Sequence, residues 1–229
     1  MGVPLVSMEE RPGFFKRFGM LFSAPGELFA GLVKKPDLIW PLLFLLISVG
    51  FSFVVNEVTT QTLADTFPKY AEALQMQQNN VRLISGLVGG LLGAGLVWLI
   101  RAGVYSLFAK ILGGTIPKFS SVLSVVGYSY LPQTLCSIFQ GSVAALTGTI
   151  PPLGLEMGME IGDRLFTPLG LLLGEINPFS IFYLILVIIV LENTFKLSRV
   201  KAVFVAILCW AAVLGFSMLM VSLSYKFLN

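Results

Sequence analysis

The chain has 229 residues, of which 56% are hydrophobic and only 12% are charged, and its mean hydropathy is +0.88. So few charged side chains cannot cover the surface of soluble domains, which predicts an all-α integral membrane protein. The sequence contains no histidine, which excludes histidine-based catalytic triads, imidazole proton shuttles and Cys/His metal sites. Cys136 and Cys209 lie in apolar runs, where a thiol behaves as a small hydrophobic side chain. We therefore expect no enzyme, no metal and no cofactor.

Five apolar runs are long enough to cross a hydrocarbon core of about 30 Å, for which roughly 20 helical residues suffice. They are residues 38–56, 83–111, 119–146, 176–195 and 202–225. A charged stretch precedes the first run and no small-residue cleavage site follows it, so we expect a retained span rather than a signal peptide. We predict a membrane domain of five helical spans over residues 38–229, preceded by a cytoplasmic segment over residues 1–37.

The basic residues between the spans predict the topology, because basic loops stay on the cytoplasmic side. The N-terminal segment and the second and fourth connections hold ten of them: Arg11, Lys16, Arg17, Lys34, Lys35, Lys110, Lys118, Lys196, Arg199 and Lys201. The other side holds four, namely Lys69, Arg82, Arg164 and Lys226. We expect a cytoplasmic N-terminus and an outside C-terminus in a plasma (inner) membrane. The net charge of +3 then reflects topology, and we expect no nucleic-acid partner.

The N-terminal segment carries aromatic side chains at helical spacing. The aromatic residues concerned are Phe14, Phe15, Phe18, Phe22 and Phe29. A Ser-Ala-Pro-Gly-Glu break over residues 23–27 divides the segment into two short amphipathic helices, which we expect to lie in the cytoplasmic interface. Two interpretations remain open: a membrane-surface anchor, or a docking surface for a protein partner.

The two outside connections differ in composition. Residues 57–82 form a polar loop with near-helical spacing of apolar residues, which indicates short amphipathic helices. Residues 149–177 are too apolar for a free loop and too interrupted for a regular span, so we predict a re-entrant or interfacial segment. Within it, Glu156, Glu160 and Asp163 would share a helical face, either as solvated carboxylates or as a cation site.

Arg101 and Glu192 are the ionisable residues well inside the predicted spans, with Asn193 beside the second. An unpaired charge there costs about 2.5 to 3.5 kcal/mol even on the translocon-insertion scale, so they should be paired or hydrated. We expect them to form an interhelical latch. The alternative is a gate or a proton-coupled relay, close to a helix kink at Pro132.

Four glycines in the second span indicate close helix packing. Gly86, Gly89, Gly90 and Gly93 form two overlapping GxxxG patterns, which allow two backbones to approach in lipid. No strand precedes them, so they do not indicate a dinucleotide-binding loop. We favour packing within one chain, with a homodimer as the alternative.

Three stretches of the sequence resemble the Yip1 domain family of multispan membrane proteins. They are the entry to the first span, the glycine turn with the third span, and the start of the fourth span. The residues that match are Asp37, Leu38, Pro41, Gly113, Gly114, Gly127, Tyr128, Ser129, Pro132, Asn177, Pro178 and Phe179. The resemblance implies five spans and a cytoplasmic N-terminus. Eukaryotic members are associated with Rab GTPases, but this chain is similar to the compact prokaryotic form, so Rab binding is not carried over.

These observations lead to two expected functions. The first is a non-catalytic scaffold or adaptor that binds membrane lipids and unidentified protein partners, because interfacial surface is abundant and no catalytic constellation is visible. The second is a small transporter, channel or lipid-handling protein with a polar path near Arg101 and Glu192.

Overall fold

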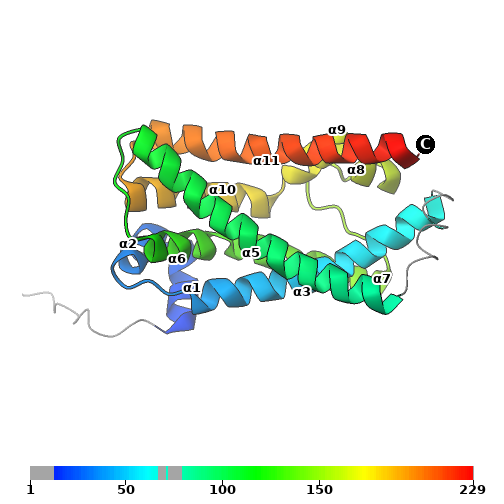
Figure 1. Cartoon of the computed structure of the whole chain (residues 1–229), viewed down its shortest axis with the longest axis horizontal. Coiled ribbons are helices and arrows are strands. Elements are labelled where there is room, and N and C mark those ends of the chain that lie inside the picture. Colours follow the sequence, from blue (N-terminus) through cyan, green and yellow to red (C-terminus); the bar gives the residue numbers. More distant parts are fainter. Residues whose placement is uncertain (1–12, 67–70, 72–78, 229) are drawn as a thin grey trace, which may run out of the picture.

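The computed structural model describes residues 13–66, 71 and 79–228, and the regular structure of this part is helical throughout (Figure 1). Ten helices follow one another along it: α1 (Phe14–Ser23), α2 (Pro25–Lys34), α3 (Ile39–Thr66), α5 (Asn79–Ile111), α6 (Phe119–Ser129), α7 (Leu131–Thr147), α8 (Ile161–Phe166), α9 (Pro168–Glu175), α10 (Pro178–Phe195) and α11 (Arg199–Leu228). The protein is an all-α multispan membrane bundle, as predicted.

Five helical segments are long and apolar enough to cross a membrane. They are Ile39–Asp65, Asn80–Ile111, Phe119–Thr147, Pro178–Phe195 and Arg199–Leu223. The helix of the first span, α3, continues about ten residues beyond the predicted end of that span at residue 56. It includes much of the polar stretch that was expected to form separate short helices. Its extension is joined to α5 by an ion pair between Glu57 and Arg82 at 2.8 Å. The predicted helical turns around Phe67, Tyr70 and Leu74 lie outside the described residues.

The third span consists of two helices that meet at Tyr130. Pro132 stands in the first turn of α7, where its missing N–H costs no helical hydrogen bond. The backbone N–H of Tyr130 bonds to the carbonyl oxygen of Gly127 at 3.1 Å, which tightens the end of α6. The break turns the Tyr130 side chain towards α5 and α10, where the candidate site lies.

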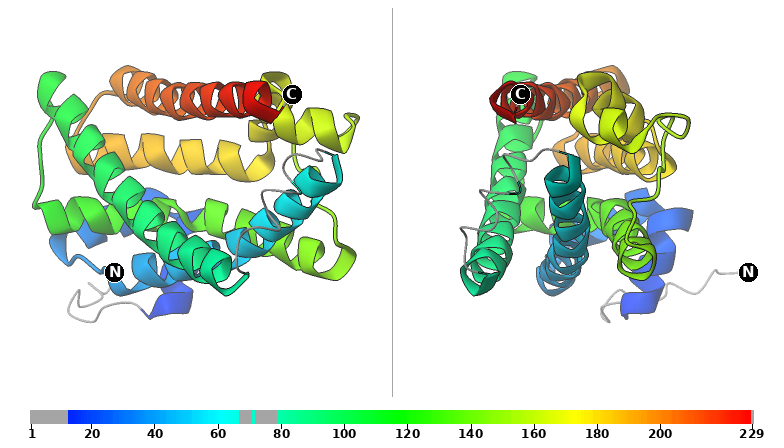
Figure 2. Two further views of the ribbon diagram at one scale, coloured as in Figure 1. Left: turned by 45° about the vertical axis from the view of Figure 1, so that its right-hand side comes forward. Right: turned by 90° about the vertical axis from the view of Figure 1, so that its right-hand side faces the viewer.

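The fourth span, α10, is the centre of the bundle. It packs against α2, α6, α7 and α11, while α3 packs against α5 and α7 (Figure 2). Its inward side chains include Leu186, Val187, Val190 and Leu191, all almost completely buried. The outer helices α3, α5 and α11 instead expose large apolar side chains, as lipid-facing helices do.

One end of the bundle gathers the basic connections, and we call it the basic end. The loop between α5 and α6 meets the end of α10 there, because the Thr115 N–H donates to the Phe195 carbonyl oxygen at 2.8 Å. Gly113 has φ +76, and a Cβ on Gly114 would lie 2.6 Å from the Phe195 carbonyl oxygen. Both glycines are therefore required by the backbone path. Lys201 Nζ also donates to the Leu112 carbonyl oxygen at 2.8 Å.

The two N-terminal helices have the predicted amphipathic pattern, but they are built into the bundle rather than lying free in the interface. Leu21 and Phe29 are 0% exposed and belong to the same hydrophobic core as α6 and α10. Figure 1 shows α1 crossing the direction of the long helices. Phe29 is therefore a core residue, which corrects the expectation that it lies on a partner or membrane face.

The segment between the third and fourth spans folds into α8 and α9, at the end of the bundle opposite the basic end (Figure 1). Glu156 lies in a turn before α8 and is buried, whereas Asp163 lies within α8. The predicted helical face shared by Glu156, Glu160 and Asp163 does not form. No cluster of three potential metal ligands exists among the described residues, so the cation-site interpretation was wrong.

Candidate functional site

Arg101 lies at mid-height in the bundle, on the face of α5 that turns towards α10. It lies ten residues, or about 15 Å, from the end of α5 at the basic end. Its Nη1 donates a hydrogen bond to the Tyr183 hydroxyl at 2.8 Å. The guanidinium carbon also lies 4.8 Å from the centre of the Tyr130 ring and 5.6 Å from that of Tyr183, within the range of cation–π attraction.

Three tyrosines from three elements surround this arginine. Tyr105 follows Arg101 by one helical turn on α5, and its hydroxyl lies 3.3 Å from the hydroxyl of Tyr183 on α10. Tyr130 stands at the break in the third span, with its ring 5.5 Å from that of Tyr183. None of the three tyrosines could be identified from the sequence, because a tyrosine in an apolar run does not reveal which way its hydroxyl points.

A cavity of about 430 Å³ adjoins this group, within the range of about 300 to 1,000 Å³ typical of ligand pockets. It is bounded by α5, the third span, α9, α10 and α11. The helix α5 crosses obliquely and diverges from α11 along its length (Figure 1). The polar lining residues are Arg101, Tyr105, Tyr130, Gln133, Glu175, Tyr183, Trp210 and Ser217; most of the remaining lining residues are apolar.

Two hydrogen-bond donors that line this cavity, Arg101 and Trp210, lack an expected partner among the described residues. Arg101 forms no ion pair with any described residue. The indole Nε1 of Trp210 is buried and has no hydrogen-bond partner within the described part of the chain. Trp210 lies eleven residues, or about 16 Å, along α11 from the basic end, which is close to the depth of Arg101.

The predicted latch between Arg101 and Glu192 does not form. Glu192 lies nine residues, or about 13.5 Å, beyond Tyr183 on α10 and faces Arg199 at 3.9 Å. The Arg199 side chain is 86% exposed, so this contact is a surface pair at the basic end. Asn193 donates to the Ile189 carbonyl oxygen, and its amide lies against Gly26 of α2. The positions of these residues could not be predicted, because the sequence does not show which helices are neighbours in the bundle.

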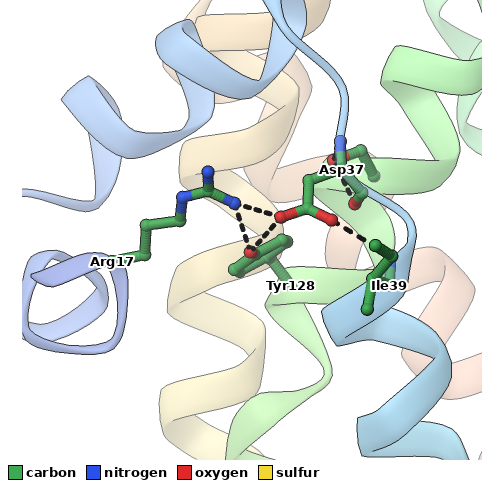
Figure 3. Close-up of polar contacts among 5 residues, drawn as sticks. Arg17, Asp37, Ile39 and Tyr128 are labelled. Carbon is green, nitrogen blue, oxygen red and sulfur yellow. Dashed lines mark hydrogen bonds and ion pairs between the residues drawn. The ribbon is translucent and has the colours of Figure 1, made fainter. Parts of the chain in front are cut away.

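A second polar cluster joins the first matched motif to the third span (Figure 3). Arg17 of α1 forms a buried ion pair with Asp37. The Tyr128 hydroxyl donates to Asp37 Oδ2 at 3.2 Å and accepts from Arg17 Nη1 at 3.1 Å. Burial opposes the charge of Arg17, but Tyr128 and Asp37 outweigh it and raise the pKa of the guanidinium. From the sequence alone, Arg17 is one of the basic residues that predict the topology, and nothing indicates its pairing with Asp37.

The backbone of Asp37 is bound as firmly as its side chain. Ser124 Oγ accepts from the Asp37 N–H at 3.0 Å and donates to the Asp37 carbonyl oxygen at 2.9 Å. Asp37 Oδ1 accepts from the Ile39 N–H at 3.1 Å and so caps the start of α3. Every hydrogen-bonding group of this aspartate is therefore used in holding α1, α3 and α6 together.

Other matched positions have structural reasons of the same kind. A Cβ on Gly127 would lie 2.3 Å from Cβ of Pro41, so glycine permits α6 to touch the start of α3. Asn177 caps α10 by accepting from the Ser180 N–H at 2.9 Å, and Pro178 occupies the first helical position. Of the remaining positions, Ser129 donates to the Val126 carbonyl oxygen, Leu38 contacts the core, and Phe179 is half-buried.

The glycines of the second span divide between two faces of α5. A Cβ on Gly86 would lie 3.1 Å from the Phe53 ring, and one on Gly90 would lie 3.2 Å from Val49, so both face α3. Gly89 and Gly93 have no heavy atom of the described residues within 4 Å of such a Cβ. Only one of the two GxxxG patterns is thus used for packing within this chain.

The remaining aromatic residues of the predicted partner face are placed unequally. The Phe14 ring stacks on Trp40 with centroids 3.7 Å apart, and the Phe22 ring stacks on Phe182 at 5.2 Å. Phe18 is half-buried against the core. Phe15 is 86% exposed, and is the most outward member of the set.

The family model of the Yip1 domain matches residues 18–220. Searches of curated proteins and of solved structures found no match. The family match includes all three stretches whose resemblance was noted in the sequence, and it covers nearly the whole chain. The protein therefore belongs to the Yip1 domain family.

Proposed function

We propose that this chain is a non-catalytic lipid-handling protein, which binds an amphiphilic membrane molecule in the cavity beside Arg101. The observation that carries this proposal is an arginine at mid-span, without an ion-pair partner among the described residues, at the wall of a cavity of about 430 Å³. An unpaired charge at that depth is costly, and ionisable residues inside spans commonly mark substrate paths or ligand sites. This is the second of the two functions expected from the sequence.

The cavity has the composition of a site for an amphiphile. A few polar groups gather at one level around Arg101, and most of the remaining lining residues are apolar. Such a distribution fits one polar head and one or more hydrocarbon chains. Most lining residues come from α5, α10 and α11, and the outer faces of α5 and α11 bear exposed apolar side chains, so a ligand could enter from the lipid phase.

The proposal is tested by purifying the protein from its native membrane in lipid nanodiscs and identifying retained molecules by mass spectrometry. We expect one class of amphiphile in stoichiometric amount. A variant in which Ala212 of the cavity wall is replaced by tryptophan narrows the space and should lose that molecule while remaining folded, because Ala212 is exposed and is not packed in the core. A native protein that retains only bulk lipid, in the same proportions as the variant, would contradict the proposal.

A scaffold or adaptor role is the second candidate, and one observation favours it. The Arg17–Asp37 pair clamps α1 to the bundle, so Phe15 and Lys16 are presented outward at a fixed position near the basic end. We expect Phe15→Ala to abolish capture of a protein partner by crosslinking in native membranes, with Ile116→Ala as an exposed control. Undiminished capture by the Phe15 variant would rule out this face.

The predicted orientation belongs to the same proposal. We place the basic end in the cytoplasm of a prokaryotic cell, with the C-terminus outside the plasma membrane, because the basic connections meet at one end of the bundle. Reporter fusions at Thr149 and at the C-terminus should both report the outside. A cytoplasmic signal from either fusion would contradict this orientation.

A further inference from the structure

We propose that the head of the bound amphiphile is acidic, a carboxylate or a phosphate, and that it binds at mid-span between Arg101 and Trp210. This inference rests on the proposed function and names the ligand chemistry of the same site. The shared chemistry of the two heads is a negatively charged oxygen that accepts charged and neutral N–H donors. A fatty acid and a phosphatidic acid are the two sources that the experiment below distinguishes.

The charge of the site selects this head. Arg101 supplies a permanent positive charge, since guanidinium remains protonated in proteins. Its hydrogen-bond partner, Tyr183, is neutral, and the cation–π contacts are with neutral rings. An acidic head would provide the counter-charge that no described residue provides, and it would form the charge-assisted hydrogen bonds that are the strongest in proteins.

The donors of the site converge at one depth. Arg101 retains several N–H groups beyond the one that Tyr183 accepts. Trp210 contributes the buried indole N–H without an acceptor. The Tyr105 and Tyr183 hydroxyls are hydrogen-bonded to each other at 3.3 Å, which leaves one of their two O–H groups free to donate to a ligand. A neutral alcohol would satisfy one or two of these groups, whereas a carboxylate or phosphate has enough lone pairs to satisfy most of them.

The acidic residue that lines the same cavity lies at its far end. Glu175 ends α9, before the start of α10, while Tyr183 lies one and a half turns into α10. Its Oε2 accepts a hydrogen bond from Ser180 Oγ at 3.2 Å. Negative charge at that end and positive charge at mid-height would orient an acidic ligand with its head at Arg101.

The binding experiment uses quenching of Trp210 by brominated chains. The full-length protein is placed in nanodiscs of phosphatidylcholine and titrated with dibrominated stearic acid, dibrominated stearyl alcohol and a dibrominated phosphatidic acid. Quenching in the protein is compared with that in a Trp210→Phe variant, and the difference reports occupation of the cavity. The variants are Arg101→Gln and a matched control, Arg199→Gln, which removes a positive charge from the exposed pair with Glu192.

We expect at least one acidic probe to bind about 10-fold or more tightly than the alcohol. We expect Arg101→Gln to remove that preference and Arg199→Gln to retain it. The stronger of the two acidic probes then identifies the source as a carboxylate or a phosphate head. If Arg101→Gln does not fold, the preference of the unmodified protein for acid over alcohol decides the question.

Two outcomes would overturn the inference, and they are distinguishable. Equal binding of the alcohol and both acids would show that an amphiphile occupies the cavity without selection for an acidic head, so the proposed function would stand. Failure of all three probes to quench Trp210 would remove both the inference and the proposed function.

Discussion

Arg17 and Arg101 both point into the bundle, but of the two only Arg17 is paired with a carboxylate among the described residues. Arg17 is buried against Asp37 and Tyr128, and every hydrogen-bonding group of that aspartate is used. Arg101 lies at mid-span against neutral tyrosines and beside a cavity. Buried charges in proteins are paired or serve a function. This difference supports a structural role for the Arg17 cluster and the binding role that we propose for the Arg101 cluster.

The largest expected effect comes from breaking the Arg17 cluster at its acid. Asp37→Asn leaves Arg17 buried without a counter-charge, and removing one partner of a buried pair costs about 3–5 kcal/mol. The free energy of unfolding can be measured by titration with sodium dodecyl sulfate in mixed micelles. Asp65→Asn is the matched control, because Asp65 is exposed, and should change little. Similar unfolding free energies for both variants would contradict a structural role for Asp37.

The next effect tests the close approach beneath that cluster. Gly127→Ala places a methyl group 2.3 Å from the Pro41 ring, and overpacking of this kind costs about 1–3 kcal/mol. Gly103→Ala is the control, because nothing lies within 4 Å of its Cβ and alanine favours a helix by roughly 0.5–1 kcal/mol. The same titration should show the two variants moving in opposite directions. A stabilised Gly127→Ala protein would show that this contact is loose.

A smaller effect is expected at the Arg101 cluster, and on binding rather than stability. Tyr183→Phe keeps the ring beneath the guanidinium but removes the hydroxyl that accepts from Arg101 at 2.8 Å. We expect the affinity for an acidic probe to fall by roughly threefold to tenfold, the equivalent of one hydrogen bond. Tyr128→Phe removes a hydroxyl from the Arg17 cluster instead. It serves as the comparison and should leave the affinity for the probe unchanged.

The smallest effect is expected at Glu192. Its pair with Arg199 is exposed and 3.9 Å long, and such pairs contribute about 0–1 kcal/mol. Glu192→Gln should therefore leave the unfolding free energy and the affinity for an acidic probe almost unchanged. Loss of a pH-dependent ion flux in reconstituted vesicles carrying this variant would instead support the proton-coupled relay.

The features that follow from local pattern were predictable from the sequence. Runs of apolar residues predict the five spans, and the spacing of Phe14, Phe18 and Phe22 predicts α1 as an amphipathic helix. The motif positions were recognisable because their roles are local or strict. Asn177 caps a helix, Gly113 adopts a positive φ, and Gly127 has no room for a Cβ.

The features that follow from helix order were not predictable. Arg17 and Asp37 are joined to Tyr128, more than ninety residues away along the chain, and nothing in the local pattern indicates that contact. Arg101 was expected beside Glu192 because both are charged and both lie in spans. Its actual neighbours are tyrosines, because α5 crosses α10 at a level nine residues before that glutamate. An arginine is attracted to the faces of aromatic rings as well as to carboxylates.

The most direct test of the central claim compares Arg17→Met with Arg101→Met in one set of nanodiscs. We measure the unfolding free energy and the affinity for dibrominated stearic and phosphatidic acids. We predict that Arg17→Met loses about 3–5 kcal/mol of stability but binds the preferred probe normally while folded. Arg101→Met should change the unfolding free energy by less than about 1 kcal/mol, because the contacts that are lost and the burial of charge that is relieved offset each other. The same variant should no longer bind the acidic probe. Equal losses of stability in both variants, with probe binding intact in Arg101→Met, would contradict the account.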